Sequence, residues 1–205
     1  MENNIIVKSK EYLKQKFSCH SIILYGSFVD GSYNNESDID IICFSDNKDS
    51  QNDTSMIEGW QLDAWIYNTV KMEKPEELLR INEGKIILDE KNLCEKLLQD
   101  INKFFNKGSK KLTLEEIAFQ KNWLKKMLKR SKLGDIEGNF RYYWMLVDSL
   151  EIYFAIKGLR YIGPKKSLLW LKNNDIDGYK LFDNALKPNS SFEDIEKLIN
   201  YIVEL

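Results

Sequence analysis

The chain has 205 residues, which is enough for one or two domains with a sizeable core. Its formal net charge is −2, so no strong general attraction to nucleic acid is expected. His20 is the single histidine, which argues against histidine-based zinc sites and histidine-assisted nucleophiles. The three cysteines are not spaced like metal ligands, and their odd number argues against a disulfide framework.

An apolar run over residues 21–25 predicts a buried strand that leads into Gly26-Ser27. Gly26 permits a close backbone approach. Ser27 offers a hydroxyl and an amide at an expected helix N-terminus, where an anionic phosphate is favoured. We therefore expect a phosphate-binding turn at these two residues.

A second apolar run, residues 39–44, carries Asp40 and follows Asp38. Alternate side chains of a strand share a face, so Asp38 and Asp40 should point the same way. Two carboxylates on one face repel each other unless a cation lies between them, and Mg²⁺ binds carboxylate oxygens together with substrate phosphates. The polar stretch 45–55 that follows is expected to be an exposed loop.

Residues 60–67 alternate like a strand, with Asp63 on the side opposite Leu62, Ala64 and Ile66. An unpaired acid is costly to bury in such a strand, and a metal ion would remove that cost. The alternative is an edge-strand aspartate turned to solvent. Because Asp63 follows Asp38 and Asp40 in the sequence, we favour it as the third metal ligand.

Gly26, Ser27, Asp38, Asp40 and Asp63 occur in the order found in the nucleotidyltransferase superfamily related to polymerase β: a glycine-serine turn, aspartate-x-aspartate on the next strand, and a later third acid. The chain resembles this superfamily over roughly its first 95 residues. The resemblance implies two Mg²⁺ ions held by the three aspartates. It also implies ATP or another nucleoside triphosphate as co-substrate.

From about Lys91 onward the pattern has helical period. We predict helices over about 90–105, 113–132 and 138–157, from 163 and from 191, with capping boxes at Thr113/Glu116 and Ser191/Asp194. A polar, glycine-containing link at 106–111 separates the two patterns. The predicted class is α+β, with a nucleotidyltransferase domain over 1–106 and a helical acceptor-binding domain over 107–205. This arrangement resembles the small kanamycin and lincosamide nucleotidyltransferases.

The predicted helix 138–157 places Arg141, Trp144, Asp148 and Glu151 on one face, opposite an apolar side with Tyr143, Val147, Leu150 and Phe154. Asp148 or Glu151 could take a proton from an acceptor hydroxyl or attract a cationic acceptor such as an aminosugar. The alternative is an ordinary charged face with internal ion pairs.

Lys165 and Lys166 follow Gly163-Pro164 at an expected helix start. Lysines there oppose the helix dipole, which is understandable if they bind an anion such as the triphosphate tail. Two solvated surface lysines are the alternative. The basic residues between 121 and 132 are expected to form a solvated face, because Ile117, Leu124 and Leu128 recur at core spacing.

These observations predict a Mg²⁺-dependent transfer of a nucleoside monophosphate, most simply AMP, to a hydroxyl of a small acceptor such as an aminoglycoside or lincosamide. The alternatives are an antitoxin-like enzyme that adenylylates a partner protein, a template-independent RNA polymerase, and a non-catalytic nucleotide-binding module. The near-neutral charge disfavours a polynucleotide acceptor. No apolar run reaches membrane-spanning length and residues 1–4 lack a signal-peptide pattern, so we expect a cytoplasmic protein without membrane contact. The sequence does not decide between a monomer and a homodimer.

Overall fold

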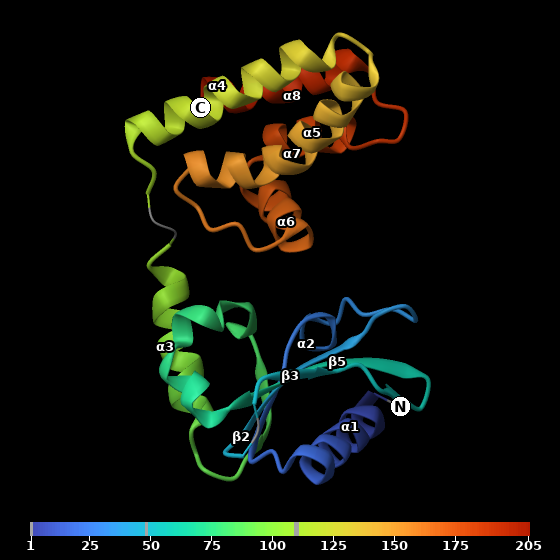
Figure 1. Ribbon diagram of the computed structural model, residues 1–205, viewed down its shortest axis with the longest axis vertical. Coiled ribbons are helices and arrows are strands. Elements are labelled where there is room, and N and C mark those ends of the chain that lie inside the picture. The colour runs from blue at the N-terminus through green and yellow to red at the C-terminus, as the bar shows by residue number, and fades with distance from the viewer. Residues whose placement is uncertain (1, 48, 109–110) are drawn as a thin grey trace. The chain divides into compact units, whose positions relative to one another are not determined.

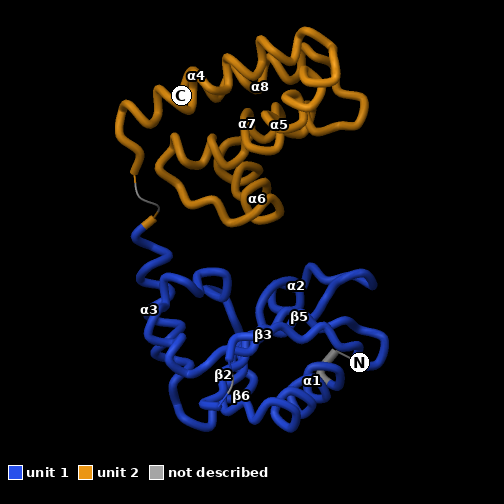
Figure 2. The backbone as a smooth tube through the Cα atoms, viewed as in Figure 1, with its two compact units in different colours: residues 1–107 blue, residues 108–205 orange. Residues whose placement is uncertain are grey.

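The computed structural model describes residues 2–47, 49–108 and 111–205. It divides into two compact units, Met1–Lys107 and Gly108–Leu205 (Figure 2), and each is described by itself. Residues 109–110 of the polar link lie outside the described residues. Each unit has buried apolar clusters of its own, so each has the packing of a domain.

Unit 1 alternates short strands with helical segments. In chain order its elements are α1 (Glu2–Phe17), β1 (Ser21–Leu24), α2 (Ser27–Asp30), β2 (Ile39–Ser45), β3 (Gln51–Asp53), β4 (Met56–Ile57), β5 (Trp60–Asn68), the 3₁₀ helices η1 (Thr69–Glu73), η2 (Pro75–Glu77) and η3 (Leu79–Ile81), β6 (Lys85–Asp89) and α3 (Cys94–Asn106).

The sheet is mixed, with strand order β3-β5-β2-β1-β6 and β4 paired with β5 off this path. β2 and β5 are parallel, while β1 is antiparallel to β2 and to β6. Side chains of β2 alternate between the two faces of the sheet and so contribute to two hydrophobic cores. Ile41 and Cys43 pack toward α1, and Ile42 and Phe44 pack toward α3 and the 3₁₀ segments. α1 and α3 accordingly lie on opposite sides of the sheet (Figure 1). The central strands are therefore covered on both faces, which explains why they read as continuous apolar runs.

The loop prediction for 45–55 was wrong in part, because Gln51–Asp53 forms β3 and pairs with β5. Asp53 is buried, and its carboxylate accepts hydrogen bonds from Lys16 Nζ at 2.6 Å and from the Ser55 amide at 2.9 Å. The polar composition of this segment gave no sign of an edge strand. Its backbone groups nevertheless form hydrogen bonds with the neighbouring strand β5. Lys48, inside the predicted loop, lies outside the described residues.

Unit 2 is helical, as expected. Its helices are α4 (Leu114–Ser131), α5 (Ile136–Ile156), α6 (Pro164–Asn174), α7 (Ile176–Ala185) and α8 (Phe192–Glu204). Both predicted capping boxes are confirmed, at Thr113/Glu116 and at Ser191/Asp194. α4 packs on α5 and α8, and the buried side of α5 supplies much of the core, including Met145, Tyr153 and Phe154.

The apolar side predicted for the helix 138–157 is only half right. Leu150 and Phe154 are buried, but Tyr143 is 67% exposed and Val147 is 72% exposed. The helix begins at Ile136, two residues before the predicted Gly138, because the Asp135 side chain accepts the Gly138 amide and caps it. No helix among the described residues has the length and apolar character needed to cross a membrane.

Candidate active site

Gly26 lies where β1 ends and α2 begins, against the start of β2. Its backbone angles, φ 69° and ψ −149°, belong to a region that side chains with a Cβ rarely enter. A Cβ on Gly26 would lie 2.1 Å from Asp40 Oδ2. The Tyr25 amide also donates a hydrogen bond to the Asp40 carbonyl at 3.0 Å. The turn and the carboxylate are thus in direct contact, and this contact is open only to glycine.

Asp40 and Asp63 are register partners of the parallel β2–β5 pair. Neighbouring strands lie about 4.8 Å apart, so two half-buried carboxylates start from adjacent backbone positions on one face of the sheet. Like charges directly across a strand pair repel each other. This arrangement and the cradle left by Gly26 fit a divalent cation, because a cation is the group that makes such a pair favourable.

Asp38 is the residue before Ile39, at which β2 begins, and it is exposed. Within the described ranges, no group of three or more His, Cys, Asp or Glu side chains is arranged to hold a metal ion. The structure therefore brings Asp40 and Asp63 into register, and the grouping of Asp38 with them stays a prediction.

Asn52 is a neighbour of Asp63 that the sequence did not indicate. Its Nδ2 donates a 2.7 Å hydrogen bond to Asp63 Oδ1. β3 carries Asn52 and pairs it with Trp65, two residues after Asp63 on β5. The amide orients the Asp63 carboxylate. The polar composition of residues 45–55 predicts a loop, so no pattern in the sequence points to this contact.

Arg80, on η3, stands on an aromatic platform beside the two acids. Its guanidinium carbon lies 5.7 Å from the centre of the Tyr25 ring and 5.4 Å from that of Trp65. Nη2 donates to the Tyr67 hydroxyl at 3.0 Å. Arg80 is exposed, so its donors are accessible to a ligand. The short η3 has no sequence periodicity, and only the aromatic residues alternating with Asp63 on β5 could have suggested a platform.

Burial and the charges of Arg80, Asp40 and Asp63 all affect the pKa of Tyr25. Burial raises the pKa of its phenol well above the usual range. The positive charge of Arg80 opposes this rise in pKa, and the negative charges of Asp40 and Asp63 add to it. Tyr25 is therefore a protonated hydrogen-bond donor at neutral pH, and the arginine and the acid pair belong to one electrostatic environment.

Ser27 opens α2, a single turn that ends at Gly31 in the left-handed conformation. Gly26 occupies the N-cap position of α2, so no side chain of the N-cap residue caps this turn. Ser27 is half-buried next to the Gly26–Asp40 contact. Its role in binding phosphate stays a prediction.

The predicted residues of unit 2 fall into two places. Asp148 and Glu151 line a hollow of about 370 Å³ between α4 and α5, together with Trp144. Arg141, predicted on the same face, instead pairs with Glu137 one turn earlier. Lys165 and Lys166 stand in the first turn of α6, directly after Pro164. Their predicted contact with the triphosphate tail stays a prediction.

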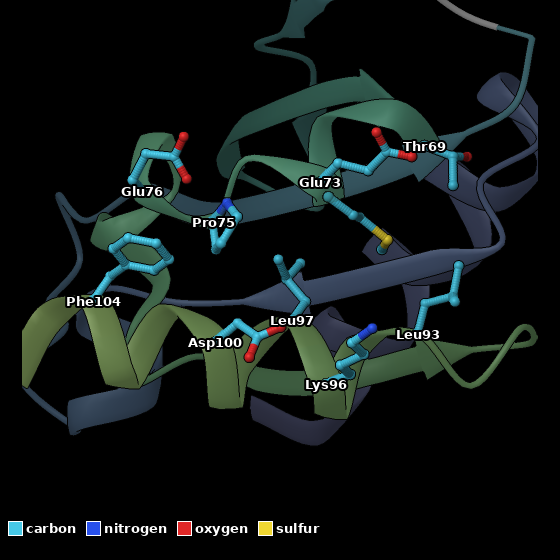
Figure 3. Close-up of a pocket in the computed structure, with 10 residues that line it drawn as sticks. Thr69, Glu73, Pro75, Glu76, Leu93, Lys96, Leu97, Asp100 and Phe104 are labelled. Carbon is cyan, nitrogen blue, oxygen red and sulfur yellow. The ribbon is translucent and has the colours of Figure 1, made fainter.

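Another hollow, of about 470 Å³, lies in unit 1 between the 3₁₀ segments and α3 (Figure 3). Leu93, Leu97 and Pro75 give it apolar walls, while Glu73 and Asp100 add acids. None of the residues predicted as functional lines it. His20, the single histidine, is buried with its ring nitrogens 2.8 Å from the hydroxyls of Ser21 and Thr69, in keeping with a structural role.

Comparison with known proteins identifies a family for this chain. A family model described as nucleotidyltransferase domain matches residues 6–131, more than half of the chain. No curated protein matches the chain. Among solved structures, the crystal structure of a nucleotidyltransferase-like protein from Exiguobacterium sibiricum 255-15 is 12% identical, with a TM-score of 0.44, over 100% of this chain and 73% of that chain. The family assignment rests on the domain match.

Proposed function

The chain belongs to the nucleotidyltransferase domain family, and on this premise we propose that it transfers a nucleoside monophosphate, AMP from ATP, to a hydroxyl group of a small-molecule acceptor. Pyrophosphate is the second product. Aminoglycosides and lincosamides are the first acceptors to test. The observation that carries the proposal is the contact of Gly26 with the Asp40 carboxylate, directly opposite Asp63.

Asp40 and Asp63 are the residues that hold Mg²⁺ in this proposal, with Asp38 as the predicted third ligand. When bound, Mg²⁺ supplies positive charge to the phosphate oxygens and to the attacking and leaving oxygens. Asn52 keeps the Asp63 carboxylate oriented by its hydrogen bond to Oδ1. The Gly26-Ser27 turn, beside Asp40, binds the β- and γ-phosphates through backbone amides and the serine hydroxyl.

Arg80 binds a phosphate oxygen of the triphosphate and retains it as pyrophosphate forms. The guanidinium is rigid because two rings and the Tyr67 hydroxyl hold it. A planar, always charged group suits a phosphate better than a flexible ammonium group does. Lys165 and Lys166 are proposed as further contacts of the tail.

In the transfer itself, the acceptor oxygen forms a bond to the α-phosphorus, and the bond from that phosphorus to the oxygen bridging the α- and β-phosphates breaks. The electron pair of the broken bond leaves with pyrophosphate. The hydroxyl proton passes to a carboxylate. Asp63 is the first candidate, because Asn52 fixes its orientation, and Asp148 and Glu151 are the alternatives. Most of the rate enhancement comes from positioning and charge neutralisation.

The test is a transfer assay with α-labelled ATP and Mg²⁺ against aminoglycosides, lincosamides and co-purifying proteins, with products identified by mass spectrometry. We expect an adenylylated small molecule and released pyrophosphate. Asp40→Asn should abolish the transfer, while the control Asp100→Asn, an exchange on α3, should not. Full turnover by Asp40→Asn would overturn the assignment. Labelling of a protein alone would move the acceptor to the protein class.

A further inference from the structure

The hollow between α4 and α5 in unit 2 has a distinctive lining. Phe119, Gln120 and Trp123 face it from α4, and Trp144, Asp148, Glu151, Ile152 and Ala155 face it from α5. We propose that this groove binds a compact organic cation that carries an apolar or aromatic ring. Resting on the proposed function, this cation is the acceptor of the nucleotidyl group.

Aromatic rings form the apolar part of the groove. Trp123 and Trp144 meet edge to face, with ring centres 5.5 Å apart and planes at 75°. Phe140 packs on Trp144 in a similar way, at 6.1 Å. Edge-to-face pairs leave ring surface open to a third group, and Trp144 is 44% exposed. Grouped, exposed aromatic residues are typical of binding surfaces.

The charges at the groove have one sign. Asp148 and Glu151 are its two ionisable lining residues, and both are acids separated by one turn of α5. Asp148 is half-buried, and no hydrogen bond or ion pair of its carboxylate is found among the described residues. The nearby cation Arg141 is directed to Glu137. A positively charged ligand would therefore face two acids without competition from an arginine.

The two features together define the ligand class. An ammonium group near Asp148 and Glu151 gains charge attraction in a partly desolvated groove, and the tryptophan faces add cation–π attraction. A volume of about 370 Å³ suits one small ring system, and not a polymer. Anions are repelled, and neutral rings lose the electrostatic part of the affinity.

Binding to the full-length chain can be measured by calorimetry without nucleotide or metal. Phenethylammonium and its neutral counterpart phenethyl alcohol are matched probes, and benzyltrimethylammonium tests the cation–π contact. We expect both cations to bind about tenfold more tightly than the alcohol. Asp148→Asn and Trp144→Leu should each weaken cation binding about tenfold, because one removes charge and the other the ring face.

Matched variants separate the groove from general effects. Glu204→Gln, at the exposed end of α8, removes an acid elsewhere in unit 2, and Tyr143→Leu removes an exposed aromatic ring of α5 that does not line the groove. Neither should change the affinity, and circular dichroism checks that every variant is folded. Equal affinity for cation and alcohol, equal losses in the controls, or no binding at millimolar concentration overturns the proposal.

The groove and the transfer reaction can fail separately. If the cations bind as expected but none of the ring-bearing amines that also carry a hydroxyl is adenylylated, the groove is not the acceptor site. If an acceptor is adenylylated while Asp148→Asn and Trp144→Leu leave its KM unchanged, the groove proposal fails and the proposed function stands.

Discussion

The two carboxylate sites proposed for this protein differ in how their acids are brought together. In unit 1, Asp40 and Asp63 belong to different strands and are joined by backbone register, with Gly26 pressed against one of them. In unit 2, Asp148 and Glu151 share a single helix and are joined only by its periodicity. Strand pairing fixes the backbone positions of both acids, whereas a helix face leaves long side chains free to pair with different neighbours. Arg141 turning to Glu137 illustrates that freedom.

The largest expected effect comes from breaking the register pair by charge. Asp63→Asn should lower transfer about 1000-fold, since it removes a group that acts on the reacting atoms. In metal-free buffer the same variant should be more stable than the wild type, by about 0.5 kcal/mol, because like charges no longer face each other. Mg²⁺ should raise the unfolding temperature of the wild type and not that of the variant. An equal rise in both would remove Asp63 from the metal site.

The Gly26 contact can be tested against another glycine with the same backbone constraint. Gly26→Ala should lower transfer about 100-fold, because the new methyl group displaces the Asp40 carboxylate. Gly31 also has a positive φ, 76°, but a Cβ there meets nothing within 4 Å. Gly31→Ala should therefore cost about 1 kcal/mol of stability and leave transfer nearly unchanged. Equal loss of transfer in both variants would mean that backbone strain, and not the contact, matters.

The way in which each pair of acids is brought together also decides how much of it the sequence reveals. The alternation along β2 and β5 indicated the faces of Asp40 and Asp63, and the glycine requirement made the turn recognisable. The α+β class, with the nucleotidyltransferase domain first, is confirmed. The register between the strands was not predictable, because period-two alternation is equally compatible with several pairings.

Asn52 and Arg80 could not be found from the sequence, for two physical reasons. Asn52 lies in a polar segment that is a strand only because β5 offers it backbone partners. Arg80 lies in a three-residue 3₁₀ segment, too short for any periodic signal. The face of α5 was misjudged at Tyr143 and Val147 because helical periodicity shows an apolar stripe without showing which part of it is covered.

Asp175, in unit 2, is an acid with several fixed partners, in contrast to Asp148. It accepts hydrogen bonds from Tyr153 at 2.5 Å, from Tyr201 at 2.7 Å and from the Gly178 amide at 3.0 Å. Burial favours its neutral form, but these hydrogen bonds outweigh burial and lower its pKa. Asp175→Asn should cost about 2 kcal/mol of unfolding free energy at pH 7.

The pH dependence follows from the direction of that pKa shift. The unfolded aspartate titrates near pH 3.9 and the folded one lower, so the stabilisation is complete above the unfolded value and is lost as the pH falls through the folded pKa. Chemical unfolding at pH 7 and pH 3 should show a smaller difference between wild type and Asp175→Asn at pH 3. The control Asp177→Asn, in the first turn of the same helix, should change stability by under about 0.5 kcal/mol. A pH-independent difference would mean that charge plays no part.

The smallest expected effect concerns Arg80, which is held by side chains, namely the Tyr25 and Trp65 rings and the Tyr67 hydroxyl. Arg80→Gln should weaken ATP and pyrophosphate binding about tenfold, the loss of one charge-assisted hydrogen bond. Arg80→Lys should recover little, because an ammonium group cannot reproduce the stacked, planar donor. Calorimetry with pyrophosphate in the presence of a chelator isolates this contact from the metal. If Arg80→Lys binds pyrophosphate as the wild type does, the Tyr25 and Trp65 rings do not select arginine over lysine. The position of this cation would then be no more closely defined than the positions of the acids on the α5 face.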